Sequence, residues 1–262
     1  MNITKGTLLA LLALVLATVP AAARQRFGDE TLNYKVLFKW GIVQKQAGRA
    51  TLSLRSNGKD YVSTLYARSE PWADHFYTLR DTLVSTMGAA DMLPVRYERI
   101  AHEGGRFAHD IIDIRRVENV FVGESTRHRR GKGETEVSTT SVTLQAEGPT
   151  VDLLSVFYYL RNIDFANLSA GYTKTINIFS GKKRENLKIE YHGLENLKLE
   201  GRNYPTYRIS FTFTTDGKTK SSDDIDTWIW VNSTHIPLKL EGKLKVGKIR
   251  CLYTGGTVPL KK

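Results

Sequence analysis

Histidine and acidic side chains are the first candidates for chemistry, because together they could bind a metal ion. The chain contains six histidines. None of them stands near a second ligand at a spacing that suits zinc, which prefers four ligands at the corners of a tetrahedron. His109 and Asp110 are adjacent, but neighbours in a strand point to opposite faces, so one ion cannot easily take both. The sequence therefore predicts no metal site and no cofactor.

Nucleophilic catalysis would require a serine or cysteine oriented with a base and an acid. The sequence has no Gly-x-Ser-x-Gly motif and no phosphate-binding glycine loop. Ser155 falls in a predicted helix and Cys251 in a predicted strand, where each is expected to pack. A pair of carboxylates for glycoside hydrolysis could always be found among 27 acidic residues. We therefore expect a non-catalytic protein; a polysaccharide-processing enzyme would need two acids that meet in a cleft.

The densest basic segment is Arg127–Gly133, which the strand pattern places at a hairpin tip. Two interpretations stay open for it. A charged tip between glycines can simply be solvated. Alternatively, Arg127, Arg129 and Arg130 contact a phosphate or uronate group, because planar guanidinium groups suit planar anions.

One segment that could position such groups is a helix at Thr150–Arg161. Pro149 and Thr150 suit its start, and Asp152 and Arg161 carry the charges that favour its two ends. Between those ends, apolar and aromatic side chains cover nearly the whole circumference. A helix of this kind has to be enclosed. Since almost every other segment alternates, the enclosure is expected to be a curved sheet.

Alternation of apolar and polar residues predicts the strands. In Glu30–Trp40 it continues without interruption from Leu32 to Trp40, which indicates one buried and one solvated face. Further strands are predicted at 47–54, 61–68, 83–86, 95–102, 107–117, 120–127, 134–144, 173–179, 188–192, 197–200, 207–214, 227–231, 238–246 and 249–253. The predicted fold is mainly all-β: a large curved antiparallel sheet, open barrel or sandwich with one buried helix near 150–162, in one domain over 24–262.

Residues 69–81 interrupt the alternation with Pro71 and three aromatic residues, Trp72, Phe76 and Tyr77. We interpret this segment as a lid or a short irregular helix over the edge of the sheet. Its aromatic side chains either cap the core or contact a ligand.

The N-terminus has the three parts of a secretory signal peptide: a charged Lys5, an apolar run over Leu8–Val19, and small residues ending at Ala23. A membrane anchor is the alternative, but the run is shorter than the ~20 residues that a bilayer core requires. We expect cleavage near Ala23 and a mature chain without a transmembrane segment. The lone Cys251 cannot form an internal disulfide, which suits a bacterial periplasm or cell surface.

The formal net charge of +11 favours anionic partners. Nucleic acid, lipid headgroups and acidic glycans all belong to this class. Because the predicted signal peptide directs the chain out of the cytoplasm, we expect an envelope lipid or an anionic glycan and no nucleic acid.

Several short motifs together resemble one bacterial family. They are Gly28-Asp-Glu-Thr-Leu-Asn-Tyr-Lys-Val, Trp40-Gly-Ile-Val, Ala47-Gly-Arg-Ala-Thr-Leu, Arg80-Asp81, Met92-Leu-Pro-Val, Asp152-Leu-Leu-Ser-Val-Phe-Tyr-Tyr-Leu-Arg161, Trp228-Ile-Trp-Val-Asn-Ser-Thr-His-Ile-Pro-Leu and Lys245-Val-Gly247. Taken in this order, the chain resembles the bacterial domain-of-unknown-function family 3108. The resemblance implies a β-rich envelope protein of Gram-negative bacteria and brings no catalytic residues with it.

The leading functional hypothesis follows from the expected architecture. If one helix covers only part of a large curved sheet, the remaining apolar concavity can hold a lipid or another amphiphile. The candidate ligand-binding residues are aromatic residues of the lid and the helix, and arginines near a headgroup: Trp72, Phe76, Tyr77, Phe157, Tyr158, Tyr159, Arg127, Arg129 and Arg130. The alternative is an envelope structural or assembly protein that binds another protein or an acidic polysaccharide.

Overall fold

The computed structural model describes residues 27–215, 218–219, 225–243 and 247–259, so the predicted signal peptide lies outside the described residues. The strands are β1 (Glu30–Trp40), β2 (Val43–Ser56), β3 (Asp60–Ser69), β4 (Leu79–Gly88), β5 (Pro94–Glu103), β6 (Arg106–Val117), β7 (Val120–Arg130), β8 (Ser138–Glu147), β9 (Thr150–Asp152), β10 (Thr173–Phe179), β11 (Arg184–Leu199), β12 (Arg202–Thr215), β13 (Lys218–Thr219), β14 (Ile225–Trp230), β15 (Pro237–Lys243) and β16 (Lys248–Thr257). The helices are α1 (Pro71–Asp74), α2 (Ser155–Arg161) and the 3₁₀ turn η1 (Phe165–Asn167).

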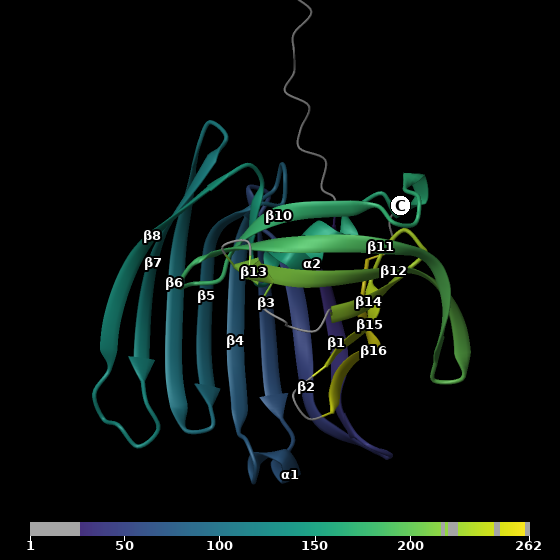
Figure 1. Ribbon diagram of the computed structural model, residues 1–262, viewed down its shortest axis with the longest axis horizontal. Coiled ribbons are helices and arrows are strands. Elements are labelled where there is room, and N and C mark those ends of the chain that lie inside the picture. Colours follow the sequence, from purple (N-terminus) through teal and green to yellow (C-terminus); the bar gives the residue numbers. More distant parts are fainter. Residues whose placement is uncertain (1–26, 216–217, 220–224, 244–246, 260–262) are drawn as a thin grey trace, which may run out of the picture.

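All the described strands belong to one continuous sheet, which curls into an open barrel (Figure 1). Its order is β8-β7-β6-β5-β4-β3-β2-β1-β16-β15-β14-β12-β11-β10-β9, with β13 paired to β12. Pairing is antiparallel except between β9 and β10. The prediction of a curved antiparallel sheet with one enclosed helix is therefore confirmed, and the strands before and after α2 form a single sheet.

In Figure 1, β10, β11 and β12 run across the upper part of the molecule, with α2 beside them, and α1 lies at the opposite end. We call the face of the sheet that points toward α2 the inner face, and the other the outer face. Two clusters of buried side chains meet at α2. One contains Leu154 and Tyr158, and the other contains Leu160 together with apolar residues of β10–β12.

The helix is shorter than predicted. Thr150–Asp152 forms the strand β9, and α2 begins at Ser155. The Asp152 carboxylate accepts hydrogen bonds from the backbone N–H groups of Leu154 and Ser155, both at 2.7 Å. It therefore satisfies donors at the true start of the helix, which is five residues later than the predicted start at Thr150.

The strand predicted at 134–144 lies later in the chain, as β8 (Ser138–Glu147), and the last three residues of the strand predicted at 238–246 lie outside the described residues. Three other strand predictions also need correction. A register shift between Val36 and Leu37 interrupts the alternation of β1, so Leu37 is buried and Trp40 is 63% exposed. β4 begins at Leu79 rather than Leu83. β11 is one long strand with a bulge near Gly193, where a turn was predicted. In each case a bulge or a polar residue in the strand hides the period of two.

A buried ion pair fixes the end of α2. Nη2 of Arg161 lies 3.0 Å from Oε2 of Glu30 in β1, and Nη1 contacts the other carboxylate oxygen. The same guanidinium donates to the carbonyl oxygen of Thr234, at 2.9 and 3.1 Å, and lies over the ring of Phe27. Arg161 therefore joins the end of α2 to β1 and to the loop between β14 and β15.

Candidate functional site

On the inner face, residues that pair across successive strands form rows, which we call register rows. The exposure of the side chains changes from one register row to the next. A row across β2–β7 beside α2 is fully buried and consists of Leu54, Ser63, Ser85, Tyr97, Ile112 and Ser125. The row next to it is partly exposed at Leu65 and Leu83. The helix and the strands β10–β12 therefore close one end of the inner face more completely than the other.

A strip of partly exposed apolar side chains borders the buried core on this face. We call it the apolar strip; it comprises Ala50, Leu65, Leu83, Leu240, Cys251 and Tyr253. These residues come from β2, β3, β4, β15 and β16, which are neighbours through β1. Burial also raises the pKa of the Cys251 thiol to about 11, so this cysteine is a packing residue and not a thiolate nucleophile.

Charged side chains continue the same row beyond the apolar strip. Leu83 pairs with Arg99, Arg99 with Asp110, and Asp110 with Arg127 on successive strands. We call this the arginine cluster; its members are Asp81, Arg99, Glu103, Asp110, Arg127 and Arg129. The inner face thus passes from aliphatic to charged within one register row.

Ion pairs hold the arginines in place. Nη2 of Arg99 lies 2.9 Å from Asp81, and Arg99 also contacts Glu103. Asp110 is buried and accepts from Nε of Arg127 at 3.1 Å and from Nη2 of Arg129 at 2.5 Å. Arg127 donates through Nε alone, so its two NH₂ groups have no hydrogen-bond partner among the described residues. Those free donors could bind an anion.

Two buried polar atoms beside this cluster have no hydrogen-bond partner within the described part of the chain. They are Oη of Tyr97 and Oδ1 of Asp81. Burial and the neighbouring Glu103 carboxyl raise the pKa of the Asp81 carboxyl to about 6, and Arg99 acts in the opposite direction. An unpaired polar group in the interior is costly. Both atoms are shielded from solvent, so a ligand on the inner face reaches neither of them without movement of the surrounding side chains.

The predicted lid residues lie at the far rim, beside α1. Nε1 of Trp72 donates to the carbonyl oxygen of Gln46 at 2.7 Å, and Lys45 lies over its ring. Phe76 is 83% exposed and contacts Trp72 edge to face. Tyr77 alone reaches the arginine cluster, because its hydroxyl lies 3.3 Å from Oε2 of Glu103.

The predicted helix residues belong mainly to the core. Tyr158 is fully buried, and its hydroxyl oxygen accepts a hydrogen bond from Oγ of Ser63 at 3.2 Å. Phe157 packs against Tyr34. Tyr159 lies on another side, in a hollow of about 390 Å³ at the end of α2. The structure therefore does not bring the lid and helix aromatics together around one ligand.

The three arginines that were predicted to contact a headgroup do not all lie on the same face of the sheet. They lie in or at the end of β7 and not at the hairpin tip, which begins at Gly131. Arg127 and Arg129 point inward to Asp110, whereas Arg130 lies on the outer face over the ring of Phe107. Sequence reasoning missed Arg99, Asp81 and Glu103. These residues could have been noticed in the sequence, because they are charged and occupy the alternating positions of β4 and β5 that are otherwise mainly apolar and face inward.

Within the described ranges, no group of three or more His, Cys, Asp or Glu side chains could hold a metal ion. His109 and Asp110 do lie on opposite faces: His109 contacts Glu98 at 2.6 Å, and Asp110 contacts the inner arginines. No helix in the described part of the chain is long and apolar enough to cross a bilayer.

Comparison with known proteins gives a family and a fold. A family model described as "Protein of unknown function (DUF3108)" matches residues 33–252. No curated protein matches the sequence. Among solved structures, the chain is similar to the beta-barrel-like protein of the domain of unknown function DUF1849 from Brucella abortus. Their TM-score is 0.58 at 8% identity, with 89% of this chain and 99% of that chain covered. This likeness concerns the fold alone.

Proposed function

Because this chain belongs to the DUF3108 family of proteins of unknown function, we propose its function from its own geometry: it is an exported envelope protein that binds an amphiphile on the inner face of its barrel. The ligand has an acyl or other apolar part and an anionic headgroup. The chemistry is binding and not catalysis.

One observation carries this proposal. Leu65, Leu83, Arg99, Asp110 and Arg127 occupy one register row on five adjacent strands, so aliphatic and guanidinium groups adjoin on the inner face. An acyl chain gains free energy by covering apolar surface, at about 25 cal/mol per Å². An anionic headgroup would accept hydrogen bonds from the free NH₂ groups of Arg127.

The test is mass spectrometry of the protein purified from its native envelope, under conditions that preserve bound lipid. We expect a co-purifying amphiphile and a thermal shift with 1-oleoyl-lysophosphatidylglycerol. Arg127→Gln should lose most of that shift. Arg130→Gln is the matched control, because the same charge is removed three residues away on the outer face. A ligand-free spectrum together with no shift would refute the proposal.

A second candidate function rests on the edge strand β8. Within the described residues, β8 pairs with β7 on one side and ends the sheet order. Its first six residues are all exposed. An open, exposed edge can accept a strand from another protein. Crosslinking from Thr140 in cells that captures one protein and no lipid would favour this assembly role over amphiphile binding.

A further inference from the structure

The outer face of β2–β5 carries a groove of about 590 Å³ that is separate from the inner face. We call it the outer groove. Its lining combines basic, hydroxyl and aromatic side chains, namely Arg49, Thr51, Tyr66, Arg68, Arg80, Thr82, Ile100 and His102, with Ala67 and Asp81 beneath them. The proposed function uses none of the outer residues.

Three arginines of this groove stand side by side. Arg49 is paired with Arg68, and Arg68 with Arg80, in the register of β2, β3 and β4. Neighbouring strands are about 4.8 Å apart. The three guanidinium groups are therefore spaced along a line, as the charges on an extended polymer would be.

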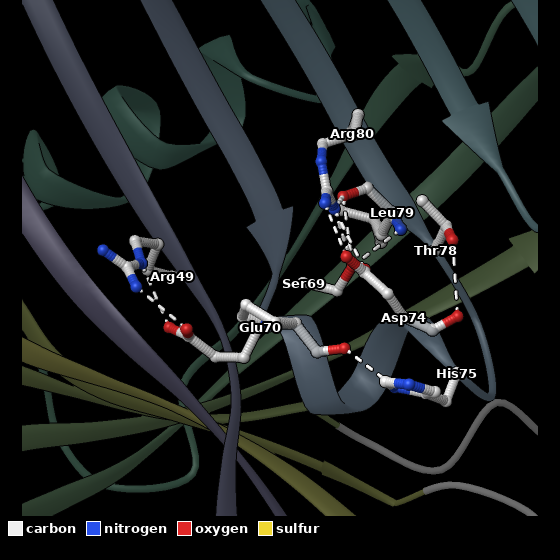
Figure 2. Close-up of polar contacts among 9 residues, drawn as sticks. Arg49, Ser69, Glu70, Asp74, His75, Thr78, Leu79 and Arg80 are labelled. Atoms are coloured by element: carbon white, nitrogen blue, oxygen red, sulfur yellow. Dashed lines mark hydrogen bonds and ion pairs between the residues drawn. The ribbon is translucent and has the colours of Figure 1, made fainter.

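The two flanking arginines of this row, Arg49 and Arg80, form ion pairs with acidic residues in α1 or next to it (Figure 2). Arg49 donates through Nε and Nη2 to the two oxygens of Glu70, at 3.0 and 2.9 Å. Arg80 donates through Nη1 and Nη2 to the two oxygens of Asp74, at 3.1 and 2.7 Å. Bidentate pairs of this kind fix the orientation of a guanidinium group. Two arginines thus have set positions before any ligand arrives.

The central arginine is different. Arg68 is exposed and has neither an ion pair nor a side-chain hydrogen bond among the described residues. It lies between two arginines that are already fixed, so three positive groups face only the two acids Glu70 and Asp74. The middle of the outer groove therefore has a positive charge without an ion pair or side-chain hydrogen bond of its own, and Glu70 attracts it only at longer range.

An exposed aromatic ring lies two residues from Arg68 in β3, on the same face of the sheet. Tyr66 is 59% exposed, and its neighbours on β2 and β4 are Thr51 and Thr82. A flat aromatic face flanked by hydroxyl groups can stack on a sugar ring and hydrogen-bond its edges. Neither a lone phosphate nor a peptide carboxylate would use all these groups.

We propose that the outer groove binds an acidic polysaccharide, with a uronate carboxylate on Arg68 and the adjoining sugar ring against Tyr66. This site is separate from the proposed amphiphile site, because Arg68 and Tyr66 lie on the opposite face of the sheet. The row of arginines favours a polymer of negative charge. The surface formed by Tyr66, Thr51 and Thr82 favours a polyanion that contains sugar rings.

The test compares three polymers with the full mature chain, at one fixed low ionic strength. Polygalacturonate carries carboxylates on sugar rings, poly-L-glutamate carries carboxylates without rings, and dextran carries rings without charge. Affinity electrophoresis in gels that contain each polymer gives the dissociation constants. We expect retardation by polygalacturonate, weaker retardation by poly-L-glutamate and none by dextran.

Variants assign the binding to the groove. Arg68→Gln should weaken binding to polygalacturonate about tenfold, which corresponds to the loss of one charge-assisted contact. Arg115→Gln is the matched control, because this arginine of β6 is 62% exposed and lies outside the groove. Tyr66→Ser should weaken binding to polygalacturonate and leave binding to poly-L-glutamate unchanged.

Two results would overturn the proposal. Equal losses in Arg68→Gln and Arg115→Gln would show that net charge alone attracts the polymer. Equal affinity for polygalacturonate and poly-L-glutamate, with no effect of Tyr66→Ser, would show that sugar rings are not recognised. All three positions are exposed, so circular dichroism of the variants should match that of the parent protein.

Discussion

Glu30 and Arg161 stand 131 positions apart in the sequence and form an ion pair in which both side chains are at least 98% shielded from water. The pair joins β1 to the end of α2. Because the helix is only seven residues long, it depends on such tertiary contacts for its place against the sheet.

Removing one partner of this pair should be costly. Arg161→Met leaves the Glu30 carboxylate buried without a counter-charge, which typically destabilises a protein by about 3–5 kcal/mol. The double variant Glu30→Gln, Arg161→Met should recover most of that loss. Urea unfolding of the three proteins measures the difference. A single variant within about 1 kcal/mol of the parent would contradict the structural role given to the pair.

Asp152 should make stability depend on pH in an unusual direction. Burial raises the pKa of this carboxyl to about 6, although hydrogen bonds from Ser85 and two backbone N–H groups lower it. Between the unfolded pKa of about 4 and the folded pKa of about 6, the folded state holds a proton that the unfolded state releases. This contribution to stability is therefore present at low pH and is lost as the pH rises through about 6.

The measurement is the difference in unfolding free energy between the parent and Asp152→Asn. We expect the parent to lose about 2 kcal/mol relative to the variant between about pH 4.5 and about pH 7.5. Comparing the two proteins cancels the other titrating groups, including Glu241, whose pKa its basic neighbours lower to about 2 despite burial. A constant difference across this range would argue against a proton on Asp152.

The two buried tyrosines Tyr97 and Tyr158 should respond oppositely to loss of their hydroxyl groups. Tyr97→Phe removes an oxygen that has no partner among the described residues, so the ligand-free protein should keep or gain up to about 1 kcal/mol of stability. Tyr158→Phe removes the bond to Ser63 and should lose about 1 kcal/mol. Thermal unfolding of the delipidated proteins gives both values; if the two changes have the same sign and size, the orphan assignment is wrong.

Gly48 should tolerate no side chain. A Cβ atom there would lie 2.7 Å from the backbone oxygen of Arg68, which cannot move without disturbing the β2–β3 ladder. We expect Gly48→Ala to cost about 1–3 kcal/mol. Gly88→Ala is the control, because its Cβ would meet only Oδ1 of Asp91 at an ordinary 3.5 Å. Chemical denaturation that ranks Gly88→Ala as the more harmful change would overturn this expectation.

Most strands could be predicted because their solvated and buried faces largely alternate. β3, β5 and β6 are of this kind, and short connections make antiparallel neighbours the natural result. The bulge after Val36 could not be predicted, since it depends on the partner strand β2 and the tight approach at Gly48. The start of α2 was misplaced because a short buried strand and a buried helix have the same apolar composition.

The candidate site was only partly predictable. Arg127 and Arg129 attracted attention as part of a basic run, but their inward direction follows from their strand register and from Asp110, which lies opposite them. Arg99 and Asp81 are separated from that run in sequence and meet it only through the pairing of β4, β5 and β6. The lid aromatics do not adjoin the helix aromatics, because α1 lies at the end of the barrel away from α2 (Figure 1).

The pairing of β1 with β16 has a consequence for how this molecule reaches its native state. Every other junction from β1 to β8 joins strands that leave the ribosome one after another, whereas β1 must wait for a partner near the other end of the chain. Loop closure over such a separation is slow in proteins of high contact order. In a partly folded intermediate, the edge of β1 that later pairs with β16 is exposed. This is the species that chaperones would have to protect.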